Sequence, residues 1–235
     1  MSRPVFVELH TTDPAASIEF YAGLFGWEPA PDPEHASGGY TPLTLGGKTV
    51  SAIGPAYVAG QQPQWVVSFA TDDAAASAKA VAELGGRTLL GPQRVFDLGT
   101  FVFVADPLGA TFTLWQPDAF PGFGVWGRPG SMGWAELSTP DPDRVIGFYA
   151  DALGWSVDRD PHYAHVGLGG EHFGGIARGE GGWKPYFEVA ELDATAAAAV
   201  GRGAETLVEP VAVGEARRVA VLRDPQGAVF GLFGK

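Results

Sequence analysis

The sequence contains neither cysteine nor asparagine, and it has no apolar run that approaches the ~20 residues of a membrane-spanning helix. Without cysteine the chain can form no disulfide, no thiolate metal site and no cysteine nucleophile. The opening MSRPVFVELHTTD also lacks the apolar core of a signal peptide. We therefore expect a cytoplasmic protein with no membrane partner.

Positive charge is scarce as well. The chain has 15 Lys and Arg against 27 Asp and Glu, which gives a net charge of -12, and its basic residues form no cluster. Nucleic-acid affinity comes mainly from neutralising phosphates, so we expect no nucleic-acid partner. The hydrophobic content of 46% is sufficient for one large core or two modest ones.

What the sequence does contain is an internal repeat. FVELHTTDPAASIEFYAGLFGW (residues 6–27) matches WAELSTPDPDRVIGFYADALGW (134–155) without a gap, and VADPLGATFTLW (104–115) matches LRDPQGAVFGLF (222–233). A third match begins at Tyr40 and Tyr163. A duplication of this extent predicts two modules of the same fold.

We expect the first module at residues 1–117, a linker at 118–130 and the second module at 131–235. The linker is rich in Pro and Gly and has no periodic pattern. Its aromatic residues make it more apolar than a free tether, so we expect it to lie along the surface of one module.

Each module opens with a strand followed by a helix. Residues 5–10 alternate, with Phe6, Glu8 and His10 on one face and aliphatic residues on the other. Asp13 and Pro14 then form a helix start, and Gly26 is typical of a helix end. Further strands are expected at residues 40–45, 49–53, 65–70, 101–104 and 111–115, with a second helix at 73–84 capped by Asp72 or Asp73.

These segments resemble the vicinal oxygen chelate superfamily, which includes glyoxalases, bleomycin-resistance proteins and extradiol dioxygenases. The resemblance rests on ELHTTDPAASIEFYAGLFGW and ELSTPDPDRVIGFYADALGW, and on the closing DPLGATFTL and DPQGAVFGL. It is greatest to two-module actinobacterial members. It implies an α+β fold of two tandem βαβββ modules, whose cup-shaped, mostly antiparallel sheets carry their helices on the outside.

The resemblance also implies where a divalent metal would be bound. Two ligands per module lie seven residues before a helix-capping acid, and the third is the Glu of DPxGxxxE. Carried over to this sequence, the positions hold Phe6, Trp65 and Thr113 in the first module and Trp134, Lys184 and Gly231 in the second. None of these is a suitable ligand for Mg, Mn, Fe, Ni or Zn, so we expect no metal and no cofactor.

Aromatic residues at ligand positions favour a pocket for a small organic molecule. The alternative is that these aromatics pack together as core. The candidate ligand-binding residues are Phe6, Glu8, His10, Trp65, Thr113, Trp134, Glu136 and Tyr186. Further polar residues on the same predicted face are Thr111, Ser138, Lys184 and Glu188.

Glu8 and Glu136 are the candidate catalytic residues because they occupy equivalent positions in both modules. A carboxylate on an aromatic wall must be partnered, solvated or protonated, and it can serve as a general acid or base. The alternative is a structural carboxylate that was duplicated with its module. We interpret His162, His165 and His172 as surface residues of a hairpin, although a different metal site formed by Glu8, His10 and one of them stays open.

Three functions are compatible with these residues. The first is a metal-free protein that binds or sequesters a small aromatic or apolar molecule, as a monomer or homodimer. The second is a lyase, isomerase or dioxygenase-type enzyme that uses Glu8 or Glu136, or a non-standard metal site. The third is a protein whose cups are closed and whose role is interaction. The lost metal ligands favour the first, while enzymatic activity stays undecided.

Overall fold

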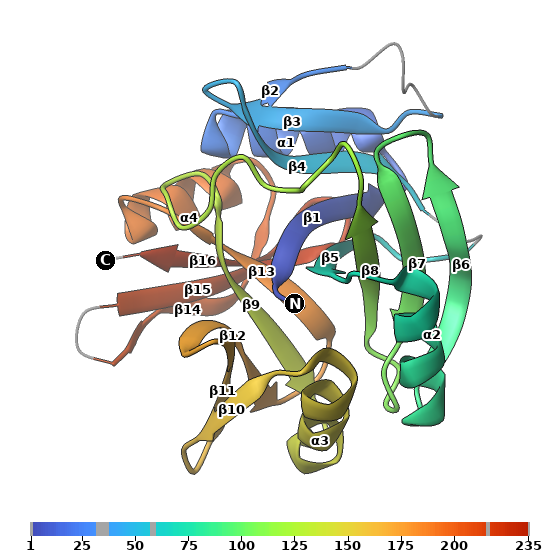
Figure 1. Ribbon diagram of the computed structural model, residues 1–235. Helices are drawn as coiled ribbons and strands as arrows, with labels where there is room; N and C mark the ends of the chain where they lie inside the picture. The colour runs from blue at the N-terminus through green and yellow to red at the C-terminus, as the bar shows by residue number, and fades with distance from the viewer. Residues whose placement is uncertain (1, 32–37, 57–59, 215–216, 235) are drawn as a thin grey trace. The chain divides into compact units, whose positions relative to one another are not determined.

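Each repeat contains two βαβββ units in succession (Figure 1). The computed structural model describes residues 2–31, 38–56, 60–214 and 217–234. The first repeat consists of β1 (Pro4–Thr11), α1 (Pro14–Phe25), β2 (Glu28–Pro29), β3 (Thr41–Leu45), β4 (Lys48–Pro55), β5 (Gln64–Ala70), α2 (Ala74–Glu83), β6 (Arg87–Val95), β7 (Gly99–Ala105) and β8 (Thr111–Pro117). The second consists of β9 (Met132–Thr139), α3 (Pro142–Leu153), β10 (Ser156–Arg159), β11 (Tyr163–Leu168), β12 (Glu171–Arg178), β13 (Gly182–Glu188), α4 (Leu192–Gly201), β14 (Glu205–Val213), β15 (Arg217–Arg223) and β16 (Val229–Gly234).

The strands form two eight-stranded sheets with the same topology. Their orders are β2-β3-β4-β1-β5-β8-β7-β6 and β10-β11-β12-β9-β13-β16-β15-β14. Neighbours within the hairpins pair antiparallel, whereas β1 with β4 and β5 with β8 pair parallel, as do β9 with β12 and β13 with β16. The expected α+β architecture of two tandem modules with mostly antiparallel pairing is confirmed, and each module is a pair of βαβββ units.

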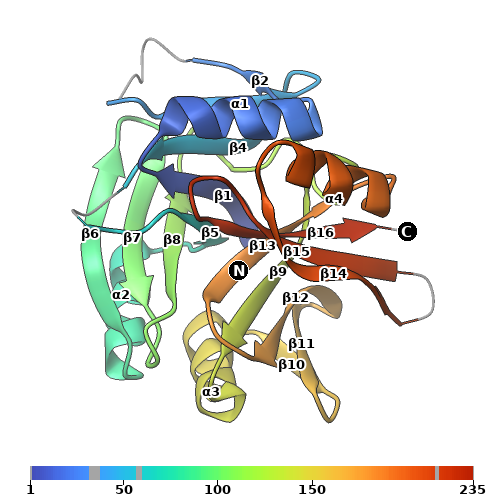
Figure 2. The same ribbon diagram turned by 180° about the vertical axis from the view of Figure 1, so that it is seen from behind.

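The same local residues start and end the first helix of each repeat. The Asp13 and Asp141 side chains accept hydrogen bonds from the backbone N–H groups of Ala16 and Arg144. Gly26 and Gly154 end the helices in the left-handed conformation, with φ of 72° and 71°. Helix α1 lies along β4 (Figure 2). Among the described residues no helix is both long enough and apolar enough to cross a bilayer.

Backbone contacts divide the chain into two compact units, and each unit takes half of each repeat. Unit 1 comprises Met1–Phe6, Val66–Gly122 and Trp134–Lys184. Unit 2 comprises Val7–Trp65, Phe123–Gly133 and Pro185–Lys235. Each half-repeat therefore packs within a unit against a half of the other repeat.

A buried chain of hydrogen bonds joins the two half-repeats of unit 2. Trp65 Nε1 donates to the Tyr21 hydroxyl (3.0 Å), which donates to Asp224 Oδ2 (2.9 Å). Asp224 Oδ1 accepts three backbone N–H groups of its own turn. The Tyr21 ring contacts Trp65, Trp27 and Phe230, at centroid distances of 5.1, 5.8 and 5.5 Å. The DPxG turn thus connects one repeat to a helix of the other.

Unit 1 contains the same arrangement with the repeats exchanged. Trp183 Nε1 donates to the Tyr149 hydroxyl (2.8 Å), which donates to Asp106 Oδ2 (3.0 Å). The Tyr149 ring stacks on Trp155 at 5.1 Å. We call Trp65–Tyr21–Asp224 and Trp183–Tyr149–Asp106 the two relays.

Candidate functional site

Trp65 does not lie on the face of the sheet where it was expected from the sequence. Helix α2 is capped by Asp73, whose side chain accepts from Ala76 N–H (2.9 Å), so Trp65 lies eight residues before the cap and Val66 lies seven. A shift of one residue moves a strand side chain to the other face of the sheet. The structure accordingly places Trp65 with Tyr21 of α1, in the helix-side core, and not on the expected ligand face. In the second repeat its equivalent is Trp183, not Lys184.

The candidate residues of the first repeat are buried. Phe6 packs edge-on against Phe120 of the segment after β8, at 5.1 Å between centroids. Phe120 also contacts Trp115 at 6.1 Å. The Thr113 hydroxyl is buried and has no hydrogen-bond partner among the described residues. Little of this face is open to a ligand.

Glu8 and His10 form a separate buried network in unit 2. Tyr40 donates its hydroxyl hydrogen to Glu8 Oε2 (3.0 Å), and His10 Nε2 lies 3.6 Å from Glu8 Oε1. His10 Nδ1 donates to the Pro55 carbonyl (2.8 Å). The side chains of Glu8 and His10 are 7% and 1% exposed. His10 therefore lies beside Glu8, in a location with little solvent access.

The second repeat brings five side chains together in unit 1, and we call them the Glu136 cluster. Lys184 Nζ lies 2.7 Å from Glu136 Oε1 and donates to Ser138 Oγ (2.6 Å). Tyr163 donates to Glu136 Oε2 (3.1 Å), and Trp134 Nε1 donates to the Tyr163 hydroxyl (2.9 Å). Both carboxylate oxygens of Glu136 are thus held, and the indole plane of Trp134 is fixed by its hydrogen bond.

Electrostatics in the cluster keep Tyr163 protonated. Burial raises the pKa of its hydroxyl well above the usual range, and the negative charge of Glu136 raises it further. Tyr163 therefore acts as a hydrogen-bond donor throughout the physiological range. The Tyr163 ring also packs over Gly175, where a Cβ atom would lie 2.2 Å from the ring, so no larger residue fits beneath it.

Solvent access distinguishes the two repeats. The side chains of Glu136 and Lys184 are 16% and 12% exposed, and Trp134 and Ser138 are also partly exposed. Their first-repeat equivalents Phe6, Glu8 and His10 are buried. Of the two equivalent faces, the second is the one that is partly open to solvent.

The remaining candidates of the second repeat lie in unit 2. Tyr186 is buried, and its ring occupies the space where a side chain at Gly231 would be, with a Cβ there only 2.2 Å from the ring. Glu188 Oε1 lies 3.4 Å from Arg217 Nη1. Tyr186 therefore packs against backbone.

The histidines of the second repeat lie on the β10–β12 hairpins, where His162 and His172 are exposed and His165 is partly exposed. His165 and His172 stack at 5.3 Å, and His172 Nε2 lies 2.6 Å from Asp158 Oδ2. His165 also contacts Trp134 at 6.0 Å. Among the described residues, no group of three or more His, Asp or Glu side chains is arranged to hold a metal ion.

The residues at the inherited metal positions do not fit a divalent metal. With the register corrected, the first repeat has Phe6, Val66 and Thr113 at these positions. In the second repeat the ammonium group of Lys184 lies at such a position and already pairs with Glu136. An ammonium group cannot coordinate a metal, and its charge repels one.

Tyr40 and Tyr163, which hold the two glutamates, were not among the predicted site residues. The sequence signal was present, because the repeat aligns these two tyrosines with each other. Their contact with Glu8 and Glu136 depends on strand pairing that the alignment alone does not give.

Comparison with known proteins agrees with this architecture. The glyoxalase/bleomycin resistance protein/dioxygenase superfamily model matches residues 3–114, and a glyoxalase-like domain model matches residues 134–233. The anthracycline biosynthesis protein DauV of Streptomyces sp. (strain C5) is 35% identical, over 97% of this chain and 92% of its own. CFP32 of Mycobacterium tuberculosis is 34% identical, over 97% and 93%.

A solved structure shows the same fold. The Mn(II)-bound glyoxalase from Novosphingobium aromaticivorans superposes with a TM-score of 0.71 at 17% identity, over 100% of this chain and 83% of its own. At that identity the likeness concerns the fold alone. The family models and the full-length relatives together show that the chain belongs to the glyoxalase/bleomycin resistance protein/dioxygenase superfamily.

Proposed function

We propose that the Glu136 cluster binds a small planar aromatic molecule that carries a hydroxyl beside a carbonyl, without a metal. The observation that carries the proposal is the Lys184–Glu136 pair, which sets a donor and an acceptor 2.7 Å apart at a partly exposed position. The ligand hydroxyl would donate to Glu136 and its carbonyl would accept from Lys184. Charged partners make such hydrogen bonds about twice as strong as neutral ones.

Trp134 supports an aromatic ligand. Its indole is held by Tyr163 and is partly exposed, so it can present a fixed face to a flat ring. The relative DauV is named as an anthracycline biosynthesis protein, and anthracyclines are polycyclic aromatics with hydroxyl and carbonyl groups. This name supports the ligand class that the cluster suggests.

The first repeat supports a structural role for its equivalent residues. Glu8 and His10 are satisfied by Tyr40 and Pro55, and they are almost fully buried. We therefore propose one ligand site per chain, in the second repeat.

Equilibrium titration with 1-hydroxyanthraquinone tests the proposal. Binding is measured by the quenching of tryptophan fluorescence. We expect saturable binding, and weaker binding of anthraquinone, which lacks the hydroxyl. Trp134→Ala is expected to weaken binding roughly tenfold, the scale of a lost aromatic contact. Phe6→Ala is the matched control in the first repeat and should leave affinity within about twofold. Equal affinity for the two compounds would refute recognition of the hydroxyl.

Proton transfer on the bound ligand is the second candidate function. The 2.7 Å Lys184–Glu136 pair favours it, because Glu136 could accept a proton while the ammonium stabilises the oxyanion that forms. Exchange of a carbon-bound hydrogen beside the ligand carbonyl with solvent deuterium would reveal this activity, because hydroxyl hydrogens exchange without a catalyst. It is refuted if exchange is as fast with Glu136→Gln as with the unmodified protein.

A further inference from the structure

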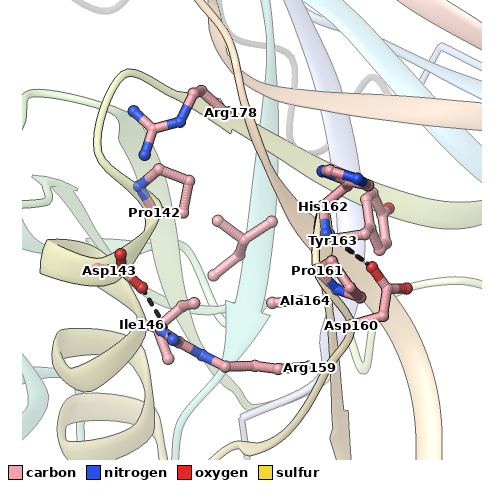
Figure 3. A pocket seen from close by; sticks show the side chains of 11 residues that line it. Pro142, Asp143, Ile146, Arg159, Asp160, Pro161, His162, Tyr163, Ala164 and Arg178 are labelled. Carbon is pink, nitrogen blue, oxygen red and sulfur yellow. Dashed lines mark hydrogen bonds and ion pairs between the residues drawn. The ribbon is translucent and has the colours of Figure 1, made fainter.

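A pocket lies in unit 1, on the helix side of the β10–β12 strands, and we call it the α3 pocket (Figure 3). It is bounded by the first turns of α3, the turn between β10 and β11, and the end of β12. Its volume is about 220 Å³, below the roughly 300–1,000 Å³ of pockets for drug-sized ligands, so it suits a compact molecule.

Apolar side chains line the inner side of the pocket. Ile176 and Ala164 are buried and line it from the sheet, while Pro142 and Ile146 line it from α3. Pro161 lines it from the turn. This surface suits a small hydrophobic body.

The other charged side chains at the rim already have partners. Arg159 Nη1 lies 2.8 Å from Asp143 Oδ1. Asp160 Oδ1 accepts the backbone N–H groups of His162 and Tyr163 (3.0 and 2.8 Å), and the hydrogen bond from His162 lowers the pKa of this carboxyl.

Arg178 is the exception. It donates to the Pro140 carbonyl (2.5 Å) and has no carboxylate within ion-pair distance among the residues that the structure describes. Figure 3 shows its guanidinium at the rim, beside Pro142. A guanidinium has five N–H donors, so most of its capacity is left for an anion.

The first repeat provides an internal comparison. The apolar residues Pro142, Ile146 and Ile176 correspond to Pro14, Ile18 and Ile53, so this part of the frame is common to both repeats. The charged residues are not shared by the two repeats, because Asp143 and Arg178 correspond to Ala15 and Pro55. These charged residues of the rim are therefore not required by the fold.

We propose that the α3 pocket binds a small organic anion, a carboxylate on a compact apolar body. The carboxylate would form a bidentate pair with Arg178, and the body would cover Ile176 and Ala164. This site is separate from the Glu136 cluster and does not depend on the function proposed for it.

Titration of the full chain with sodium benzoate tests the site, with the methyl resonances of Ile146 and Ile176 followed by NMR. We expect both to shift saturably, and Arg178→Met to weaken benzoate binding by about tenfold or more. Benzyl alcohol, the neutral counterpart, should bind more weakly than benzoate and be insensitive to that substitution.

Arg144→Met is the matched control, since it removes the same charge from the first turn of α3 at a residue that does not line the pocket. It should leave benzoate affinity within about twofold. If Arg178→Met disturbs the fold, Arg178→Lys replaces it and is expected to bind benzoate several-fold more weakly than the unmodified protein, because Lys cannot pair bidentately. Shifts that do not saturate, or equal affinities with and without the guanidinium, would overturn the proposal.

Discussion

Glu8 and Glu136 illustrate how equivalent residues diverge after duplication. Each accepts a tyrosine hydroxyl, from Tyr40 and Tyr163. The second partner differs, because Glu8 faces His10 at 3.6 Å while Glu136 pairs with Lys184 at 2.7 Å. An ammonium partner compensates the carboxylate charge directly, which permits an ionised group at a position with restricted solvent access.

The first residue-scale prediction concerns Asp224 and pH. Burial raises the pKa of its carboxyl above the usual range. The folded state therefore binds the proton more tightly than the unfolded chain, so the free energy of unfolding falls as pH rises from the unfolded pKa, about 3.9, through the folded one. Asp224→Asn cannot titrate and should lack this fall.

At neutral pH the same substitution should lower the free energy of unfolding by about 1–3 kcal/mol. The single amide oxygen cannot accept the hydrogen bond from the Tyr21 hydroxyl while it accepts those from the backbone N–H groups of the turn. Denaturant unfolding at a series of pH values measures both effects. If the difference between the two proteins is the same on both sides of that pH range, the raised pKa of Asp224 is contradicted.

At the scale of elements, the sequence predicts the regular parts well. Asp13, Pro14 and Gly26 are local signals, so α1 begins and ends where expected. Strand β6 was not predicted because it is mostly exposed, contains Gly91-Pro92 and shifts register twice against β7, so it has no period-two pattern.

Trp65 shows where pattern reasoning fails. Two adjacent aspartates, Asp72 and Asp73, were equally good caps by sequence, and the choice decides which residue of β5 is assigned to the ligand position. Neighbouring residues of a strand lie on opposite faces, so an error of one residue selects the wrong face. Only the hydrogen bond between Asp73 and Ala76 resolves it. The polar residues of the Glu136 cluster can be found by aligning the two repeats. Which of them form hydrogen bonds with each other depends on the strand register, which the alignment does not give.

Trp65→Ala tests the corrected position. Since Trp65 packs against Tyr21, Trp27 and Phe187, its truncation should lower the free energy of unfolding by about 3–5 kcal/mol. The affinity of the folded variant for 1-hydroxyanthraquinone should be unchanged. Calorimetry and titration of the same preparation decide the matter, and a stable variant with lost affinity would return Trp65 to the ligand site.

At the scale of the whole molecule, the compact units cross the repeat boundary. Each relay joins a helix of one repeat to the DPxG turn of the other, so Tyr21 and Asp224 are 203 residues apart in sequence yet 2.9 Å apart in space. The repeat itself was evident from sequence. The pairing of each half-repeat with a half of the other repeat was not evident, because both relays contain the same residue types.

The whole chain is also predicted to bind no stoichiometric transition metal, since Lys184 and Val66 replace ligands of the family site. Protein purified without added metal should contain well under one equivalent of Fe, Mn, Ni or Zn by elemental analysis. About one equivalent per chain, with an activity that is lost on its removal, would contradict this.

The most direct test of the central claim compares two equivalent substitutions in one titration. Glu136→Gln removes the charge of the proposed acceptor and should weaken 1-hydroxyanthraquinone binding roughly tenfold to a hundredfold, the scale of a hydrogen bond to a charged group. Glu8→Gln makes the same change in the buried network of the first repeat and should leave affinity unchanged. Equal affinities for both variants and the unmodified protein, or a loss confined to Glu8→Gln, would contradict the assignment of the ligand site to the second repeat.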